Sequence, residues 1–224
     1  MDDARSTIMQ KIRTAMRVSA GDAERNATVD ARLSQAPKGI VPMRGQLPQP
    51  GQVDLFEEMA TRFNATVSRV AGYGQVPAEV LAYLRGHNLP AAIRVGADAR
   101  LGQAGWERER TLEVLHGFSD GNDLAGVSHA LSGIAETGTL ALESGPDNPT
   151  TINFLPEHHI VVVRAGDIRG DMEAVWEMLR GKHGKGQMPR AFNLITGPSR
   201  SGDIEQTILL GAHGPRALHI IIVE

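Results

Sequence analysis

The sequence is a chain of 224 residues, of which 41% are hydrophobic, enough for the core of a globular domain. Its 23 basic and 26 acidic residues give a net charge of -3 without a basic block, which argues against nucleic acid as a partner. Because the chain contains no cysteine, it can form no disulfide, no thiolate nucleophile and no cysteine-ligated iron–sulfur cluster.

Residues 1–51 predict a helical arm followed by a linker. Ala4–Met16 places apolar side chains at helical spacing with basic residues on the other faces, so an amphipathic helix is predicted there. A second, more polar helix is predicted at Asp22–Gln35. The prolines and glycines of residues 37–51 predict a linker without regular structure, and the compact domain is expected to span residues 52–224. Whether the arm packs on its own domain or on a partner stays open.

Membrane and metal sites are not expected. No window approaches the roughly 18 apolar residues of a membrane span, and the N-terminus is polar, so we expect a cytoplasmic protein. The histidines show no metal-ligand spacing. The adjacent His158 and His159 would lie on opposite faces of a strand, so we predict no intrinsic metal site.

Helices and strands alternate in the first half of the domain. The patterns predict a helix at Val53–Asn64, a strand at Ala65–Val70, a helix at Pro77–His87 and a strand at Ala91–Val95. Further strands are predicted at Thr111–Leu115, Leu124–His129 and His159–Val163, with a hairpin-like return in Ser132–Glu143 and a helix at Asp171–Gly181. This order is typical of an α/β layered fold with a largely parallel sheet.

The C-terminal stretch predicts strand, helix and strand. Phe192–Thr196 and Ala217–Val223 are apolar runs of strand length. Asp203, followed three residues later by Gln206, resembles a capping box, so a short helix is predicted between the strands. This stretch has room for a crossover, and we therefore expect both strands in one parallel sheet.

Four polar or glycine-rich clusters fall beside predicted strand ends, where open α/β sheets usually bind ligands. In the first, Glu136 is the candidate acid, base or nucleophile, while Thr137, Gly138 and Thr139 would bind an anion or a hydroxyl. The alternative is that the two threonines only satisfy backbone groups of a turn.

The second cluster is the proline-containing loop Gly145–Asn153, in which Asn148 and Asn153 are candidate binding residues. Alternatively, Asn148 makes local bonds to the backbone. The third cluster offers Gly197, Ser199, Arg200 and Asp203 at the start of the predicted helix, where free N–H groups and a guanidinium could bind an anion. Alternatively, Asp203 only caps that helix.

The fourth cluster places His213, Gly214 and Arg216 in a turn before the last strand. His213 is the second candidate catalytic residue, and the alternative is a solvated turn histidine. We expect these glycine-punctuated segments to meet at one edge of a common sheet and form a single polar recess. No GxGxxG, Walker or Gly-x-Ser-x-Gly motif is present, so neither a nucleotide nor a serine nucleophile is specifically indicated.

Three segments resemble the lactate-utilization protein C family, whose domain is called LUD. They are IAETGTLAL at Ile134–Leu142, NFLPEHHIVVV at Asn153–Val163 and ITGPSRSGDIEQTILLGAHGPRALHIIIV at Ile195–Val223. The resemblance covers about residues 52–224. Where the family usually has Ser-Arg-Thr-Ala-Asp-Ile-Glu, this chain has Ser-Arg-Ser-Gly-Asp-Ile-Glu at residues 199–205.

The resemblance implies a three-layer α/β/α fold similar to the sugar-phosphate isomerase and CoA-transferase superfamily. It also implies a role beside two partner proteins, one or both with iron–sulfur clusters, in oxidising L-lactate to pyruvate. This chain would then be the cysteine-free subunit, with no intrinsic cofactor, and a small-molecule anion is a possible ligand. The alternatives are a stand-alone isomerase, CoA transferase or cyclo-ligase with Glu136 as its acid, base or nucleophile, or a purely structural or regulatory module.

Overall fold

The computed structural model describes residues 2–19, 21–204 and 207–224, and the chain divides into two compact units, Met1–Ile40 and Val41–Glu224. The first unit contains the two predicted helices, α1 (Asp2–Ala15) and α2 (Ala23–Gln35). The side chain of Asp22 caps α2 by accepting a hydrogen bond from the Arg25 N–H. Among the residues that the structure describes, no helix is long and apolar enough to cross a membrane.

Regular structure in the second unit begins before residue 52, the start predicted from the prolines and glycines of residues 37–51. Met43–Gly45 forms a 3₁₀ turn, and α3 runs from Gln49 to Arg62 with Pro50 in its first turn. Proline fits this position because the first N–H groups of a helix have no intrahelical partner. The predicted linker without regular structure is therefore wrong for these residues.

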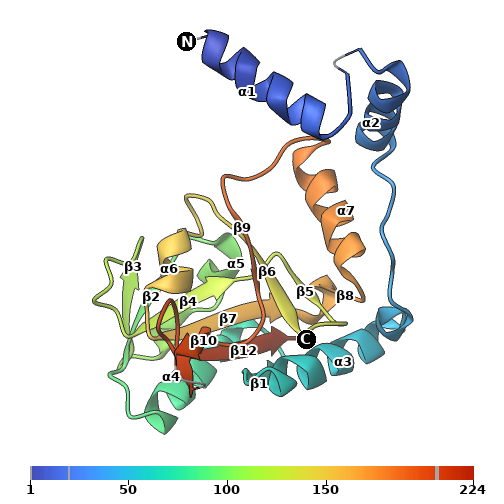
Figure 1. The fold of residues 1–224 in the computed structure, drawn as a ribbon. Helices are drawn as coiled ribbons and strands as arrows, with labels where there is room; N and C mark the ends of the chain where they lie inside the picture. Colours follow the sequence, from blue (N-terminus) through green and yellow to red (C-terminus); the bar gives the residue numbers. More distant parts are fainter. Residues whose placement is uncertain (1, 20, 205–206) are drawn as a thin grey trace. The chain divides into compact units, whose positions relative to one another are not determined.

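The second unit is built on a six-stranded sheet in the order β1-β12-β7-β4-β2-β3, in which every neighbouring pair is parallel (Figure 1). The strands are β1 (Thr66–Val70), β2 (Ala92–Val95), β3 (Glu113–His116), β4 (Ala125–His129), β7 (His158–Arg164) and β12 (Ala217–Val223). The helices between them are α4 (Val76–Gly86), α5 (Ala99–Gly102) and α6 (Thr150–Phe154). This confirms the predicted parallel α/β fold.

The core lies on both faces of this sheet because successive strand residues point to opposite sides. In β7, Ile160 belongs to the hydrophobic cluster that contains Leu84 of α4. The next residue, Val161, belongs to the opposite cluster, with Phe56 of α3 and Leu140. Helices therefore cover both faces of the sheet, as predicted.

A second sheet of four strands, in the order β8-β5-β6-β9, contributes Leu140 to that second cluster. It consists of β5 (Ser132–Ile134), β6 (Thr139–Glu143), β8 (Ile168–Arg169) and β9 (Phe192–Ile195). The β5–β6 pair is the predicted hairpin. Helix α7 (Met172–His183) packs on this sheet through Val175, and Asp171 caps its N-terminus.

Two predictions for the C-terminal stretch are wrong. Strand β9 pairs antiparallel with β6 in the small sheet and does not join β12 in the parallel sheet. The predicted helix is instead an antiparallel pair, β10 (Arg200–Ile204) and β11 (Thr207–Leu210), so Asp203 lies on a strand and not at the start of a helix. Gln206 of the proposed capping box lies outside the described residues. The run Ile204, Thr207, Ile208 is β-branched, and that composition favours a strand over a short helix.

Four histidines of the parallel sheet are buried, and three of them, His129, His159 and His219, have strongly lowered pKa values. His159 Nε2 lies 2.7 Å from Ser128 Oγ, and burial lowers the pKa of His159 to about 3. Burial likewise lowers the pKa values of His129 and His219 to about 4, and the Arg100 charge adds to the effect at His129. His158 bonds Tyr83 of α4 from the other face of β7, which confirms the opposite orientations predicted for His158 and His159.

We expect these histidines to make the fold acid-sensitive. In the unfolded chain each of these histidines has a pKa near 6.5, whereas in the folded protein the pKa is about 3 or 4. Because the unfolded state binds more protons between these values, the free energy of unfolding falls as the pH is lowered, by roughly 1.4 kcal/mol per pH unit for each histidine.

Urea unfolding at pH 7, 6 and 5 measures this slope. His219→Gln should make the slope shallower, while His116→Gln, at an exposed position, should leave it unchanged. Equal slopes for these two variants would show that burial of His219 is not responsible.

Candidate functional site

The pairing of β6 with β9 brings two of the predicted glycine-rich segments together. Leu140 is paired with Ile195 in the ladder, and just beyond this pair the Oγ1 atoms of Thr139 and Thr196 are 2.6 Å apart. Thr137 Oγ1 lies 2.7 Å from Thr139 Oγ1, which extends the contact into a chain of hydroxyls. The hydroxyls of Thr137 and Thr139 thus bond side chains, not the backbone of their turn.

Two glycines press these segments against the end of α3. Gly138 has a φ of 63°, and a Cβ there would lie 2.3 Å from the Ala60 nitrogen. Gly197 has a φ of 69°, and its Cβ would lie 2.1 Å from the Phe63 carbonyl oxygen. Only glycine combines this left-handed conformation with such close backbone contact. The helix end therefore fixes the positions of the adjacent threonines.

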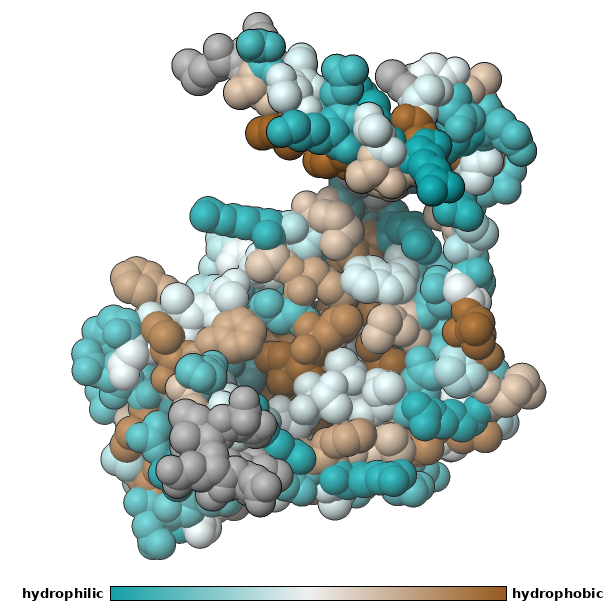
Figure 2. Space-filling view, viewed as in Figure 1, coloured by the Kyte–Doolittle hydropathy of each residue, from teal (hydrophilic) through white to brown (hydrophobic). Residues whose placement is uncertain are grey.

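A cavity of about 520 Å³ lies beside the hydroxyl chain, and we call it the threonine hollow. Figure 2 shows hydrophobic residues gathered on this face of the second unit, over β6 and β9. The hollow combines polar, apolar and basic side chains: Thr137, Thr139, Thr196, Met59, Phe63, Met172, Leu194, Arg44 and Arg62. Neither arginine was identified from the sequence, because both lie far from the glycine-rich clusters along the chain.

A second cavity, of about 310 Å³, shares Leu194 and Thr196 with the threonine hollow, and we call it the Asn153 cavity. Six of the predicted residues line it: Asn153, Gly197, Ser199, Arg200, His213 and Gly214. The candidate residues are thus divided among several cavities and do not form the single recess expected from the sequence. His159, which the sequence did not single out as a binding residue, also lines the Asn153 cavity.

Asn153 is a completely buried amide without a protein partner. Its side chain is 0% exposed, and neither Nδ2 nor Oδ1 has a hydrogen-bond partner among the described residues. His159 Nδ1 is unpartnered in the same sense. Because an unmade hydrogen bond of a buried polar group costs stability, such groups call for an explanation, and binding is one.

Glu136 lines none of these cavities. Its Oε1 accepts a hydrogen bond of 3.2 Å from the Met172 N–H in the first turn of α7, while Oε2 has no partner among the described residues. A carboxylate at this position stabilises the positive end of the helix dipole. The geometry therefore gives Glu136 a capping role, and its predicted catalytic role stays without support from position.

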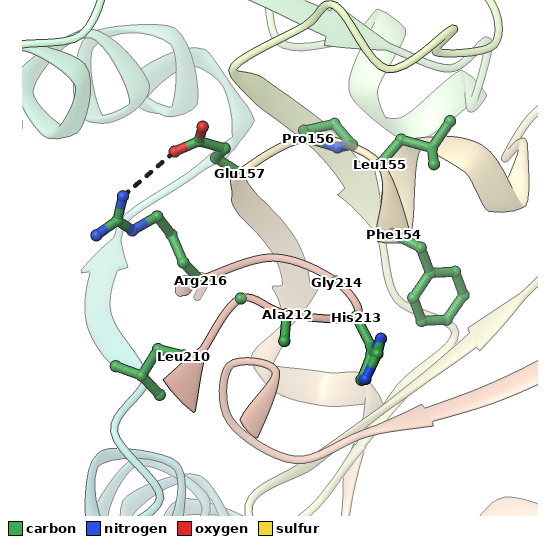
Figure 3. Close-up of a pocket in the computed structure, with 10 residues that line it drawn as sticks. Phe154, Leu155, Pro156, Glu157, Leu210, Ala212, His213, Gly214 and Arg216 are labelled. Atoms are coloured by element: carbon green, nitrogen blue, oxygen red, sulfur yellow. Dashed lines mark ion pairs between the residues drawn. The ribbon is translucent and has the colours of Figure 1, made fainter. Parts of the chain in front are cut away.

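Both predicted arginines have protein partners. Arg200 Nη2 donates to the Phe63 carbonyl at the end of α3. Arg216 Nη1 lies 3.5 Å from Glu157 Oε2 (Figure 3). His213 is exposed in the turn before β12, and Figure 3 shows its ring beside that of Phe154 in a cavity of about 530 Å³.

The second predicted cluster contributes to a further cavity, of about 330 Å³, at the carboxyl ends of β2 and β4, and the sequence interpretation missed the charged residues of this cavity. Ionisable side chains line it: Asp98, Arg100, His129, Glu143, Asp147, Lys182 and His183, together with the predicted Asn148. Parallel sheets commonly bind ligands at this edge. The local signal is Asp98-x-Arg100, which begins three residues after the predicted strand Ala91–Val95 and contains two charged side chains.

Most of the charges in this carboxyl-edge cavity are paired. Arg100 Nη2 lies 2.7 Å from Asp98 Oδ2; burial alone would raise the pKa of Asp98, but hydrogen bonds from Arg100 outweigh it and hold the pKa below its usual range. Lys182 Nζ lies 2.7 Å from Glu143 Oε2, and His183 Nε2 lies 2.6 Å from Oε1 without the alignment of a hydrogen bond. Asn148 Nδ2 donates to the Glu143 carbonyl, a local bond as in the alternative interpretation.

Known proteins are similar to this chain in sequence. The family model of the LUD domain matches residues 122–223. Lactate utilization protein C of Geobacillus thermodenitrificans is 36% identical over 170 residues, which cover 71% of this chain and 68% of that protein. The chain belongs to the lactate utilization protein C family of LUD-domain proteins. This confirms the resemblance read from the sequence motifs.

A further relative matches over a shorter segment, and a solved structure matches over most of the chain. Lactate utilization protein C of Anoxybacillus flavithermus is 37% identical over 92 residues, covering 41% of this chain and only 40% of its own length. A crystal structure of a DUF162 family protein from Deinococcus radiodurans has the same fold, with a TM-score of 0.56, 22% identity, and coverage of 80% of this chain and 99% of that chain. That structure supports the fold assignment of this LUD-domain chain.

We expect Gly138→Ala and Gly197→Ala each to destabilise the domain by about 2–4 kcal/mol, because a left-handed backbone and a backbone clash act together. Gly166→Ala is the matched control, since a Cβ there meets nothing within 4 Å and should change stability by less than about 1 kcal/mol. Urea unfolding measures all three. Equal stability of Gly138→Ala and Gly166→Ala would show that the contact with α3 is not tight.

We expect Asn153→Leu to stabilise the protein without ligand by roughly 1–3 kcal/mol, because it replaces an unpartnered buried amide with an apolar group of similar size. Asn148→Leu, which removes a satisfied amide, should instead lower stability. Thermal and urea unfolding of both variants test the difference. A loss of stability in Asn153→Leu would mean that the amide is satisfied in solution.

Proposed function

We propose that this chain is the cysteine-free subunit of a cytoplasmic iron–sulfur system that oxidises L-lactate to pyruvate. The observation that carries the proposal is its 36% identity over 170 residues to a protein named lactate utilization protein C. Since the chain has no cysteine, cysteine-ligated clusters would belong to partner subunits and not to this one.

The geometry of Glu136, a predicted candidate, and of His129, which lines the carboxyl-edge cavity, supports a role as a subunit. Glu136 bonds the first turn of α7 and lines no described cavity. At His129, Nδ1 donates to the Ala130 carbonyl at 2.7 Å, so Nε2 is the acceptor for the Tyr73 hydroxyl at 2.8 Å. His129 therefore has no free nitrogen to act as a base.

A stand-alone enzyme of the isomerase, CoA-transferase or cyclo-ligase type is the second candidate. The carboxyl-edge cavity favours it, because ionisable side chains converge there at the ends of β2 and β4. His213, exposed at its own cavity, is the remaining candidate for proton transfer. This candidate requires turnover by the purified chain without partners.

Deletion of the gene tests the proposal. We expect the deletion strain to grow normally on glucose and to lose growth on L-lactate, and the full chain supplied in trans should restore it. Affinity purification of the tagged chain from lactate-grown cells should retrieve proteins that carry iron–sulfur clusters. Undiminished growth of the deletion strain on L-lactate would refute the proposal, and turnover by the isolated chain would favour the second candidate.

A further inference from the structure

We propose that the threonine hollow is a binding site for a small organic carboxylate with an apolar body. The inference stands on the geometry of the hollow and holds whether or not the chain serves lactate oxidation. It assigns Arg44 and Arg62 to the carboxylate, the hydroxyl chain to its polar groups, and the apolar wall to the rest of the ligand.

The hydroxyl chain has an unused proton. Thr137, Thr139 and Thr196 are joined by two hydrogen bonds. A threonine hydroxyl has one proton to donate, so three hydroxyls hold three protons and the two bonds consume two of them. No other acceptor is bonded to these hydroxyls among the described residues. One O–H group of the chain is therefore available to donate to a ligand oxygen in the hollow.

The hollow is positively charged. Arg44 and Arg62 line it, and no aspartate or glutamate does. Neither arginine is in an ion pair with a described residue, in contrast to Arg69, Arg94, Arg100 and Arg216. The charges of the carboxyl-edge cavity are largely paired off, whereas those of the threonine hollow are uncompensated. Hydrogen bonds from a guanidinium to a carboxylate are among the strongest in proteins.

Both arginines are carried by anchored backbone. Arg44 lies in the 3₁₀ turn Met43–Gly45, where a Cβ on Gly45 would come within 2.1 Å of the Gly170 carbonyl oxygen. Gln46 Nε2 donates to Asp171 Oδ2 at 2.8 Å and ties the end of the same turn to α7. Arg62 is in the last turn of α3, the helix end against which Gly138 and Gly197 pack.

The apolar wall of the hollow indicates that the rest of the ligand is apolar. Four apolar side chains line the hollow: Met59, Phe63, Met172 and Leu194. Methionine side chains are flexible and adapt to the shape of an apolar ligand. The cavity of about 520 Å³ is within the range of small-molecule sites, which usually pair such walls with few polar groups. An inorganic phosphate would use the arginines but leave this wall without a role.

Isothermal titration of the full chain tests the class of ligand with matched probes. Benzoate and butyrate should bind, and benzamide, which has the shape of benzoate without its charge, should bind at least tenfold more weakly. Acetate should bind more weakly than butyrate because it lacks the apolar body. L-lactate and inorganic phosphate are the remaining probes. Binding of phosphate alone, equal binding of benzoate and benzamide, or no binding of any carboxylate would overturn the proposal.

Variants locate the site. Arg44→Gln and Arg62→Gln should each weaken benzoate binding about tenfold, which is the size expected for loss of one charge-assisted hydrogen bond. Thr139→Val should weaken it while keeping side-chain volume. Arg85→Gln is the matched control, because Arg85 is an exposed arginine in the last turn of α4. Thermal unfolding of each variant checks that it is folded, and unchanged benzoate affinity in both Arg44→Gln and Arg62→Gln would overturn the assignment.

These outcomes are separate from the lactate role. Loss of growth on L-lactate in the deletion strain with no carboxylate bound by the chain would support the proposed function and refute this site. Benzoate binding that depends on Arg62, with normal growth of the deletion strain on L-lactate, would support this site and refute the proposed function.

Discussion

The close contact of two glycines with the end of α3 brings the polar residues of the candidate site together. Gly138 and Gly197 each bring their backbone so near to Ala60 and Phe63 that no side chain fits between. The contact holds the start of β6 and the end of β9 at one place, where the threonine hydroxyls meet. Arg200 bonds the same Phe63 carbonyl, so the β10–β11 pair begins at this point as well.

This arrangement separates paired charges from unpaired ones. The carboxyl-edge cavity pairs Asp98 with Arg100 and Glu143 with Lys182, so its charges stabilise the protein itself. The threonine hollow has arginines without such partners and hydroxyls with a proton to spare. Unpaired polar groups in a cavity are poor stabilisers, which is the usual condition of a site that exists to bind something else.

Much of the fold could be predicted from the sequence because the signals are local. Apolar runs of strand length located β1, β2, β4, β7 and β12, and helical periodicity located α3, α4 and α7. Sheet membership could not be predicted in the same way, since Phe192–Ile195 has the composition of a strand in either sheet and its partner is set by distant residues. The β10–β11 pair was mistaken for a helix because four residues of capping pattern outweighed the β-branched run that follows.

The candidate site was predictable only where glycine marked it. Thr139, Ser199 and His213 lie beside glycines that shape turns, and the structure places all of them at cavities. Arg44, Arg62 and Asp98 lie outside the four clusters identified from the sequence, and their place at the cavities depends on tertiary contacts. Glu136 stands in the most suggestive motif, yet its carboxylate bonds a helix end.

The row of threonine hydroxyls has one more property, which is that its direction can reverse. Hydroxyl hydrogens rotate freely about the C–O bond, so the row can run from Thr137 towards Thr196 or the opposite way with the same oxygen positions. When the row runs in one direction, the hydroxyl at a given end donates its free proton. When the row runs in the opposite direction, the same hydroxyl accepts a hydrogen bond through a lone pair. A secondary alcohol donates a hydrogen bond where a ketone only accepts one. A reversible row of this kind can therefore match an alcohol and the ketone formed from it without any movement of the backbone.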